Sequence, residues 1–261
     1  MASAHEYITR LAANGRHHFT TVEALAALGG SLVGVRAALR RLSRRKEISS
    51  PYRGFHVILP PEYRGLGCLP AEQFIPHLMQ HLNAHYYVAL LSAAELHGAA
   101  HHRPQRFQVM VAKNRRPIDC GEVRVQFVAR HDLAQTPVVE MNTPRGRMRV
   151  SSREATVFEV VGYADQCGGL DNVASILSEL VESIEPAKLL AASLLCPIAW
   201  SQRLGYLLEA TNHGDLAGAL VDRVRAHAKT VAPLVRAKPL TAAPRAARWK
   251  LAINERVEPD L

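Results

Sequence analysis

Four arginines recur on one stretch of the chain at the spacing of helical turns. Arg36, Arg40 and Arg44 follow one another every fourth residue, so a helix places them on one face, which Arg41 widens. Each guanidinium keeps its charge and presents a fork of N–H donors that matches phosphate oxygens and the edge of guanine. The chemistry offered by this face is the binding of a polyanion.

The opposite face of the same segment is apolar. Leu32, Val35, Leu39 and Leu42 fall together at helical spacing, and Ser31 precedes them as an N-cap for a helix that runs to about Lys46. Such a helix can pack on a core and contact phosphates at the same time.

The flanking residues predict the elements that hold this helix. Residues 5–13 read as a first helix, and Thr20 or Thr21 can cap a second helix through Leu28, with Glu23 in its first turn. Gly29-Gly30 then breaks the chain. After Lys46, alternating residues predict strands at 47–49 and 55–59, joined by a turn with Arg53 at its tip. This order is typical of a winged helix-turn-helix whose wing is the hairpin.

We therefore predict a surface that binds double-stranded DNA. The predicted contacts are the cations of the basic helix and the wing, with the hydroxyl groups at the starts of the second and third helices: Thr20, Thr21, Ser31, Arg36, Arg40, Arg41, Arg44, Arg45, Lys46 and Arg53. One such domain covers a short site, so we expect two copies on an inverted repeat, as a dimer or as cooperating monomers.

The distribution of charge agrees with this prediction. The 261 residues carry a net charge of +9, and residues 1–65, with ten Lys or Arg and four Glu, hold +6 of it. Hydrophobic residues make up 48% and charged residues 21%, which excludes a chain that is mostly disordered. The four cysteines are far apart and the longest apolar run, 189–200, is too short to span a bilayer, so we expect a cytoplasmic protein without a membrane partner.

No other residue pattern in the sequence predicts a catalytic site. His77, His81 and His85 recur every fourth residue, as do His97 and His101, but no carboxylate accompanies them, and partly exposed helix histidines explain them better than metal binding does. Ser92, Glu95 and His97 share one helix and cannot line up as a triad. Gly29-Gly30-Ser31 resembles the start of a nucleotidyltransferase site, but six basic residues and no acid follow it. We predict no catalytic residue, cofactor or metal ligand, and no enzyme.

Beyond Pro60-Pro61 the pattern predicts a larger domain. Helices are expected at 72–84 and 87–99, strands at 107–112 and 123–129 joined by a turn at 114–121, and a hairpin of 137–142 and 148–150. Ser151 or Ser152 caps a helix to about 166, and helices follow at 171–184, 186–195, 198–210 and 215–227. The predicted fold class is α+β: a winged helix-turn-helix (1–62), a mixed α/β domain ending in a helical bundle (68–228) and a basic arm, extended or partly ordered (229–261).

Several blocks of the chain resemble the AbiEi antitoxin family. These are Arg53 to Ile58 with Pro60 to Arg64, Tyr86 to Ala100, Arg103 to Val109, the 152–163 helix, Gly168 to Asp171 and Gln202 to Glu209. The order and spacing of the blocks carry the resemblance, which covers roughly residues 15–210; the chain after about 228 has no match.

The resemblance implies a protein of a type IV toxin-antitoxin, or abortive-infection, system of phage defence. Such an antitoxin represses its own operon through an N-terminal winged helix-turn-helix and counteracts a nucleotidyltransferase-like toxin without needing a stable complex. Two alternatives from the residues stay open: a winged-helix regulator that senses a small ligand, and a metal-dependent nucleic-acid-processing enzyme that uses the face of His77, His81 and His85.

Overall fold

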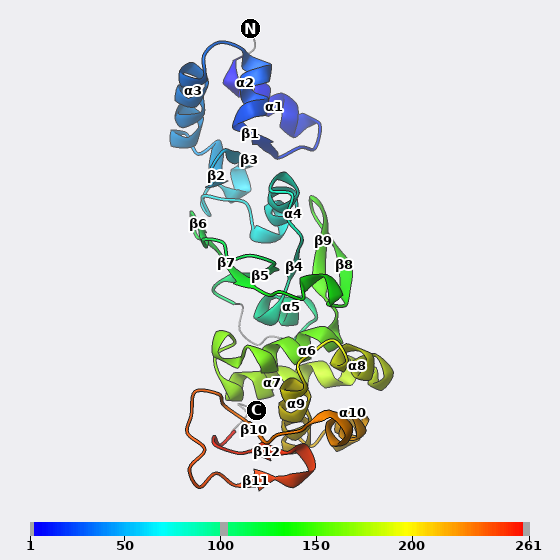
Figure 1. Cartoon of the computed structure of the whole chain (residues 1–261). Coiled ribbons are helices and arrows are strands. Elements are labelled where there is room, and N and C mark those ends of the chain that lie inside the picture. The colour runs from blue at the N-terminus through cyan, green and yellow to red at the C-terminus, as the bar shows by residue number, and fades with distance from the viewer. Residues whose placement is uncertain (1–2, 100–103, 258–261) are drawn as a thin grey trace. The chain divides into compact units, whose positions relative to one another are not determined.

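A computed structural model describes residues 3–99 and 104–257. The chain forms two compact units (Figure 1). The first comprises Met1–Tyr87, Gln105–His131 and Glu140–Arg149, and the second comprises Val88–Pro104, Asp132–Val139 and Val150–Leu261. The predicted α+β class is confirmed.

The first unit begins with three helices and three short strands. They are α1 (Ala4–Ala13), β1 (His18–Thr20), α2 (Thr21–Leu28), α3 (Leu32–Arg44), β2 (Ile48–Tyr52) and β3 (Phe55–Ile58). The strands form an antiparallel sheet in the order β1-β3-β2. This layout fits the predicted winged helix-turn-helix. The sequence did not predict β1, because three residues are too few to show an alternating pattern.

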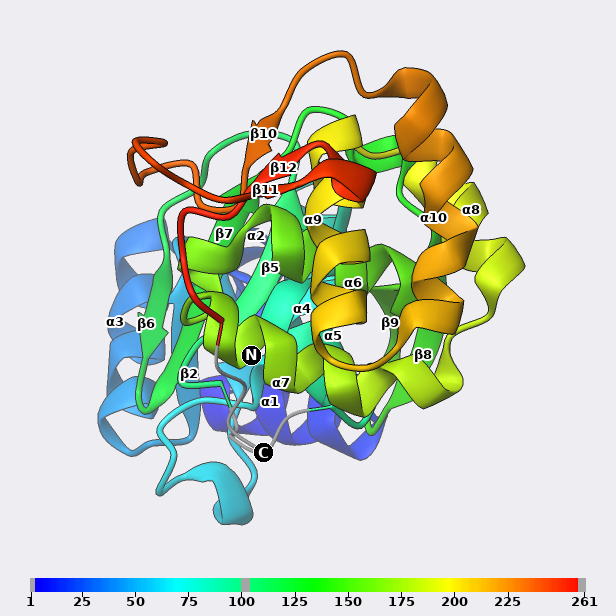
Figure 2. The same cartoon turned by 90° about the horizontal axis from the view of Figure 1, so that it is seen from below.

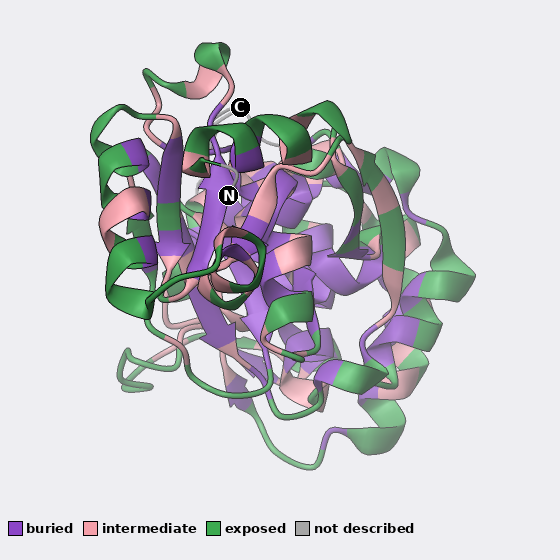
Figure 3. Ribbon diagram, turned by 90° about the horizontal axis from the view of Figure 1, so that it is seen from above, coloured by how far each residue is buried: buried purple, intermediate pink, exposed green. Residues whose placement is uncertain are grey.

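A small apolar core holds these elements together. Val35, Leu39 and Leu42 of α3 are buried with Phe19 and Ile48, as the helical spacing predicted, whereas Leu32 is 40% exposed. Figure 3 shows the same division in the ribbon, with exposed positions along the outer faces of helices. The basic face of α3 is therefore directed away from the core.

A six-stranded sheet, most of whose residues fall in the first unit, follows the wing. Its order is β6-β7-β5-β4-β9-β8, with β4 (Tyr86–Val88), β5 (Phe107–Val111), β6 (Ile118–Cys120), β7 (Val123–Ala129), β8 (Val138–Thr143) and β9 (Gly146–Ser151). The short η1 (Pro61–Tyr63) and α4 (Ala71–His81) precede it, so the helix predicted at 72–84 is confirmed in its first three turns.

Two predictions for this sheet were wrong in detail. The helix expected from Tyr87 begins only at Leu90, as α5 (Leu90–Leu96), because the buried Tyr86, Tyr87 and Val88 form β4. Aromatic and β-branched residues favour a strand, but the helical spacing of α5 continued back through them. The turn predicted at 114–121 contains β6, which pairs antiparallel with β7. β5 and β7 run parallel to each other, so they do not form a hairpin.

The second unit is mainly helical. It contains α5, α6 (Arg153–Gly162), η3 (Ala164–Gln166), α7 (Leu170–Leu180), η4 (Val181–Ser183), α8 (Pro186–Ser193), α9 (Ile198–Ala210) and α10 (Gly214–His227). The predicted helices are confirmed within a few residues at each end, including the Ser152 N-cap, whose Oγ accepts from the amide of Ala155 at 3.2 Å. α6 contacts α5, α7, α8 and α9, and α10 lies beside α9 (Figure 2).

The C-terminal segment was expected to be an extended or partly ordered arm, but residues 229–257 are folded. It forms β10 (Ala232–Pro233), β11 (Arg245–Ala246), η5 (Ala247–Trp249) and β12 (Leu251–Ala252), in the sheet order β10-β12-β11. Trp249 is fully buried against Gly205, where an added Cβ would come within 2.1 Å of the indole ring. A glycine on α9 thus makes room for the tryptophan that anchors this segment.

Among the described residues, no single helix is long and apolar enough to cross a membrane. Only α2 and α3 taken together, with a 110° bend between them, reach that length and composition.

Candidate nucleic-acid interface

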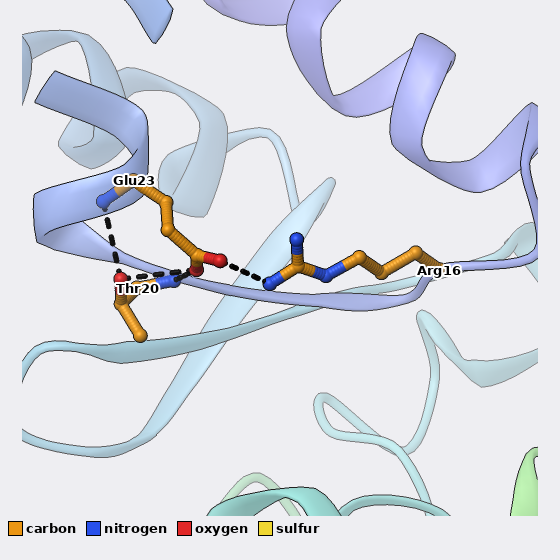
Figure 4. Close-up of polar contacts among 3 residues, drawn as sticks. All are labelled: Arg16, Thr20 and Glu23. Carbon is orange, nitrogen blue, oxygen red and sulfur yellow. Dashed lines mark hydrogen bonds and ion pairs between the residues drawn. The ribbon is translucent and has the colours of Figure 1, made fainter. Parts of the chain in front are cut away.

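A reciprocal pair of side chains fixes the start of α2. The Thr20 hydroxyl accepts from the amide of Glu23 at 3.1 Å, and the Glu23 carboxylate accepts from the amide of Thr20 at 2.7 Å (Figure 4). Arg16 also donates to that carboxylate. Burial opposes the ionisation of Glu23, but the hydrogen bonds from Arg16 and Thr20 outweigh it and lower its pKa. The predicted cap is confirmed as Thr20, and its hydroxyl is engaged within this capping box.

The next residue ties α2 to the wing. The amide of Thr21 donates to the carbonyl of Gly54 at 2.9 Å, and its hydroxyl lies 2.9 Å from Nε2 of His56. The other ring nitrogen of His56 lies 2.7 Å from the hydroxyl of Ser50 on β2. His56 is 8% exposed, and burial lowers its pKa, which favours the neutral ring. Thr21 is therefore a positioning residue that sets the wing against α2.

His56 was not among the predicted site residues, because it lies between apolar residues of a short strand, both faces of which are buried. A histidine flanked by Phe55 and Val57, next to a turn rich in hydroxyl groups, was the only available signal.

α3 presents a row of cations without carboxylate partners. Its N-terminus is capped by Ser31, whose Oγ accepts from the amide of Gly34 at 3.1 Å. Six successive basic positions are exposed, and none takes part in an ion pair among the described residues: Arg36, Arg40, Arg41, Arg44, Arg45 and Lys46. Their charges contribute little to the fold and are accessible to a partner.

A groove of about 800 Å³ lies between α2, α3 and the β2–β3 hairpin. It brings together four of the predicted contacts, Thr21, Arg36, Arg40 and Arg53. Two apolar side chains on its wall, Val22 and Leu32, are 75% and 40% exposed. The other predicted residues do not line the groove; they lie at the helix starts, on α3 or just after it: Thr20, Ser31, Arg41, Arg44, Arg45 and Lys46.

Stacked histidines hold β1 against α4. The ring of His18 on β1 lies 4.0 Å from that of His77 on α4, and Nε2 of His77 lies 3.0 Å from the carbonyl oxygen of Arg145. Burial, with the nearby His77 and Arg16, lowers the pKa of His18 to about 4. The ring of His18 is therefore neutral near pH 7, and its stacking fixes β1 on α4.

These contacts bear on the histidines that the sequence placed on one helix face. α4 ends at His81, so His85 lies outside the helix, and His77 is already engaged with Arg145. His97 is bonded to the carbonyl oxygen of Ser151 at 2.7 Å, and His101 lies outside the described residues. In residues 3–99 and 104–257, no three His, Cys, Asp or Glu side chains are placed to hold a metal ion.

The chain is similar to a known protein family and to a known structure. Residues 87–210 match a family model described as the AbiEi antitoxin C-terminal domain. No curated protein matches the chain. Among solved structures, the chain is similar to the RV2827C protein from Mycobacterium tuberculosis, with a TM-score of 0.70 and 18% identity over 95% of this chain and 90% of that one. At that identity the similarity concerns the fold.

Proposed function

Residues 87–210 belong to the AbiEi antitoxin C-terminal domain family, and on this premise we propose that the chain is the antitoxin of a type IV toxin-antitoxin system and represses its own operon. The N-terminal winged helix-turn-helix, residues 1–62, would bind the operator. The remainder of the chain would counteract a nucleotidyltransferase-like toxin. The protein would act in the cytoplasm as a regulator and not as an enzyme.

One observation carries the DNA-binding part of the proposal: the exposed cations of α3, which form no ion pair within residues 3–99 and 104–257, adjoin a groove that Arg53 of the wing also lines. α3 would lie in the major groove, with Arg36 toward base edges, while Arg40, Arg41 and Arg44, with Arg45 just after the helix, contact flanking phosphates. The exposed Val22 and Leu32 can contact thymine methyl groups, which are apolar features of the DNA major groove.

The DNA-binding test compares the full chain with Arg40→Ala/Arg44→Ala on DNA from upstream of its own gene, by fluorescence anisotropy at several salt concentrations. If both arginines contact phosphates, the slope of log affinity against log salt falls by about 1.8, since each contact contributes about 0.9. The matched control is Arg116→Ala/Arg225→Ala, which removes two exposed arginines elsewhere and leaves the net charge the same as in the test variant. Equal slopes and affinities for the two double variants would contradict the proposal.

The antitoxin part is tested separately. The full chain and Arg40→Ala/Arg44→Ala are each co-expressed with the product of the adjacent gene, from a promoter that neither controls. We expect both to restore growth, because the substitutions leave residues 87–210 unchanged. Failure of both to restore growth would contradict the antitoxin assignment while leaving the DNA-binding result intact.

A further inference from the structure

The second unit contains a pocket of about 320 Å³ that the proposed function does not use. It lies between the start of α7, the buried side of α9 and the chain at 234–238, with Glu255 at its edge. Its size is at the lower end of the range of small-molecule sites. All of its lining residues belong to one unit, so the pocket is complete within that unit.

A buried arginine lines this pocket, which we call the Arg203 pocket. Arg203, on α9, is 3% exposed, and its Nε donates to the carbonyl of Pro233 at 2.9 Å. Among the described residues, no acceptor is bonded to its terminal nitrogens and no carboxylate forms an ion pair with it. Buried charges in proteins are ordinarily paired, because an unpaired one loses its hydration without compensation. An arginine left this way beside a cavity calls for an anion in that cavity.

The charged groups around Arg203 strengthen the attraction of the pocket for an anion. Burial lowers the pKa of Arg203, and Arg236, which also lines the pocket, lowers it further, while Asp165 opposes that shift. Two like charges that face one hollow repel each other unless an anion lies between them. The third cation of the lining, Lys238, is already paired with Glu255.

Backbone groups contribute a second, independent attraction for an anion. α7 begins at Leu170, and its N-cap, Gly169, has a φ of 94° and supplies no side-chain cap. Both residues line the pocket. The N–H groups in the first turn of a helix carry partial positive charge and commonly bind phosphate.

The acids of the lining define the rest of the ligand. Asp165 and Asp171 are exposed at the rim, whereas Arg203 is buried. A carboxylate at the rim accepts hydrogen bonds from hydroxyl or amino groups and repels a second anionic group. The preferred ligand therefore has one compact anionic end and a neutral part rich in donors.

We propose that the Arg203 pocket binds a small organic phosphate, such as a sugar phosphate or a nucleoside monophosphate. Its phosphate lies between Arg203, Arg236 and the first turn of α7, and its hydroxyl groups face Asp165. This site rests on neither the DNA-binding surface nor the antitoxin assignment.

The test measures binding of inorganic phosphate, ribose 5-phosphate and adenosine 5′-monophosphate to the full chain by calorimetry and by thermal shift. At least one of the three is expected to bind, and Arg236→Ala should weaken that binding by about tenfold or more. Arg236 is exposed and makes no hydrogen bond or ion pair among the described residues, so this variant is expected to fold normally. The matched control, Arg225→Ala on α10, should bind as the unmodified chain does.

A second variant examines the role given to the rim. Asp165→Asn removes a negative charge, so it should strengthen the binding of inorganic phosphate and reduce the advantage of the hydroxyl-bearing compounds over it. The proposal is overturned if none of the three compounds binds at about 10 mM, where even a weak site stabilises the fold measurably. It is equally overturned if Arg236→Ala binds them as tightly as Arg225→Ala. DNA binding by Arg236→Ala should be unchanged, which separates this result from the test of the proposed function.

Discussion

α3 and α9 are helices of thirteen residues each, and they place their polar side chains in opposite ways. On α3 the arginines are exposed and have no carboxylate partners among the described residues. On α9 the polar residues Gln202 and Arg203 are 2% and 3% exposed and donate to backbone carbonyls of the 230–250 segment. The side-chain amide of Gln202 and the Nε of Arg203 are bonded within the fold, whereas the guanidinium groups of α3 are left available for a partner.

The difference teaches how to separate structural from functional polar residues in this chain. Removal of a buried donor leaves carbonyl oxygens without partners, which costs stability. Removal of an exposed, unpaired guanidinium costs almost nothing in the free protein, so any effect must appear on binding. The following predictions test this division, beginning with the largest effect.

Gln202→Ala should destabilise the second unit most. The side-chain amide donates to the carbonyls of Thr230, Trp249 and Lys250 at 3.2, 3.1 and 2.7 Å. Its removal opens a cavity and takes this donor from the carbonyls of Thr230 and Trp249, whereas the carbonyl of Lys250 keeps its bond from the amide of Ala232. We expect a cost of about 2–4 kcal/mol in the free energy of unfolding. Urea denaturation measures the change.

The matched control is Gln80→Ala, which removes the same side chain from an exposed position on α4. It should change stability by less than about 0.5 kcal/mol. Equal losses for the two variants would show that the carbonyl contacts of Gln202 do not anchor the C-terminal segment.

Two thiols, Cys120 in the first unit and Cys167 in the second, should differ in reactivity by about a hundredfold or more at pH 8. In the first unit, a hydrogen bond from Cys68 lowers the pKa of Cys120 to about 7, although burial opposes the shift. In the second unit, burial raises the pKa of Cys167 to about 12. Only the thiolate is alkylated, so timed iodoacetamide labelling with mass spectrometry should find Cys120 modified long before Cys167. Comparable rates would refute the difference, and Cys120→Ser should abolish the fast phase.

Acid should weaken the first unit through His18. Its pKa in the folded protein, about 4, lies below the 6.5 of an exposed histidine, so the unfolded chain binds the proton more tightly. The contribution of the neutral ring to stability is therefore complete above about pH 6.5 and is lost as the pH falls toward 4. We expect a loss on the order of 1–2 kcal/mol, smaller than the full shift implies because the ring is partly exposed.

The measurement is urea denaturation at pH 7 and pH 4.5, for the unmodified chain and for His18→Phe. Phenylalanine can stack on His77 but cannot be protonated, so the variant should lose less stability between the two pH values. An unchanged pH dependence in His18→Phe would show that other groups, such as Glu23, account for the whole acid effect.

Thr20→Ala should have the smallest of these effects on stability, about 1 kcal/mol, because it removes the N-cap of a single exposed helix. Thr20→Ser keeps the hydroxyl that accepts from Glu23 and should retain most of the stability. Since the Thr20 hydroxyl is engaged in the capping box, Thr20→Ser should also leave DNA affinity unchanged. A loss of DNA affinity without a loss of stability would instead make Thr20 a direct DNA contact.

Much of the N-terminal half was determined by local sequence. The hydroxyl caps at Thr20 and Ser31, the glycine pair after α2 and the helical spacing of Val35, Leu39 and Leu42 act within a few residues of each other. Their effects could therefore be predicted without knowing what packs against them. The exposed face of arginines follows from the same spacing, since burial of one face of α3 leaves the other in solvent.

Tertiary structure alone decided the features that join distant segments. The residues near Tyr86 do not decide between a strand and a helix, because the strands beside it come from residues 107–111 and 146–151. Likewise, Arg203 resembles any helix arginine until the 229–257 segment folds over α9, and Trp249 finds its place only because residue 205 is a glycine. Burial depends on partners far along the chain, and it is burial that turns an ordinary guanidinium into a charge in need of an anion.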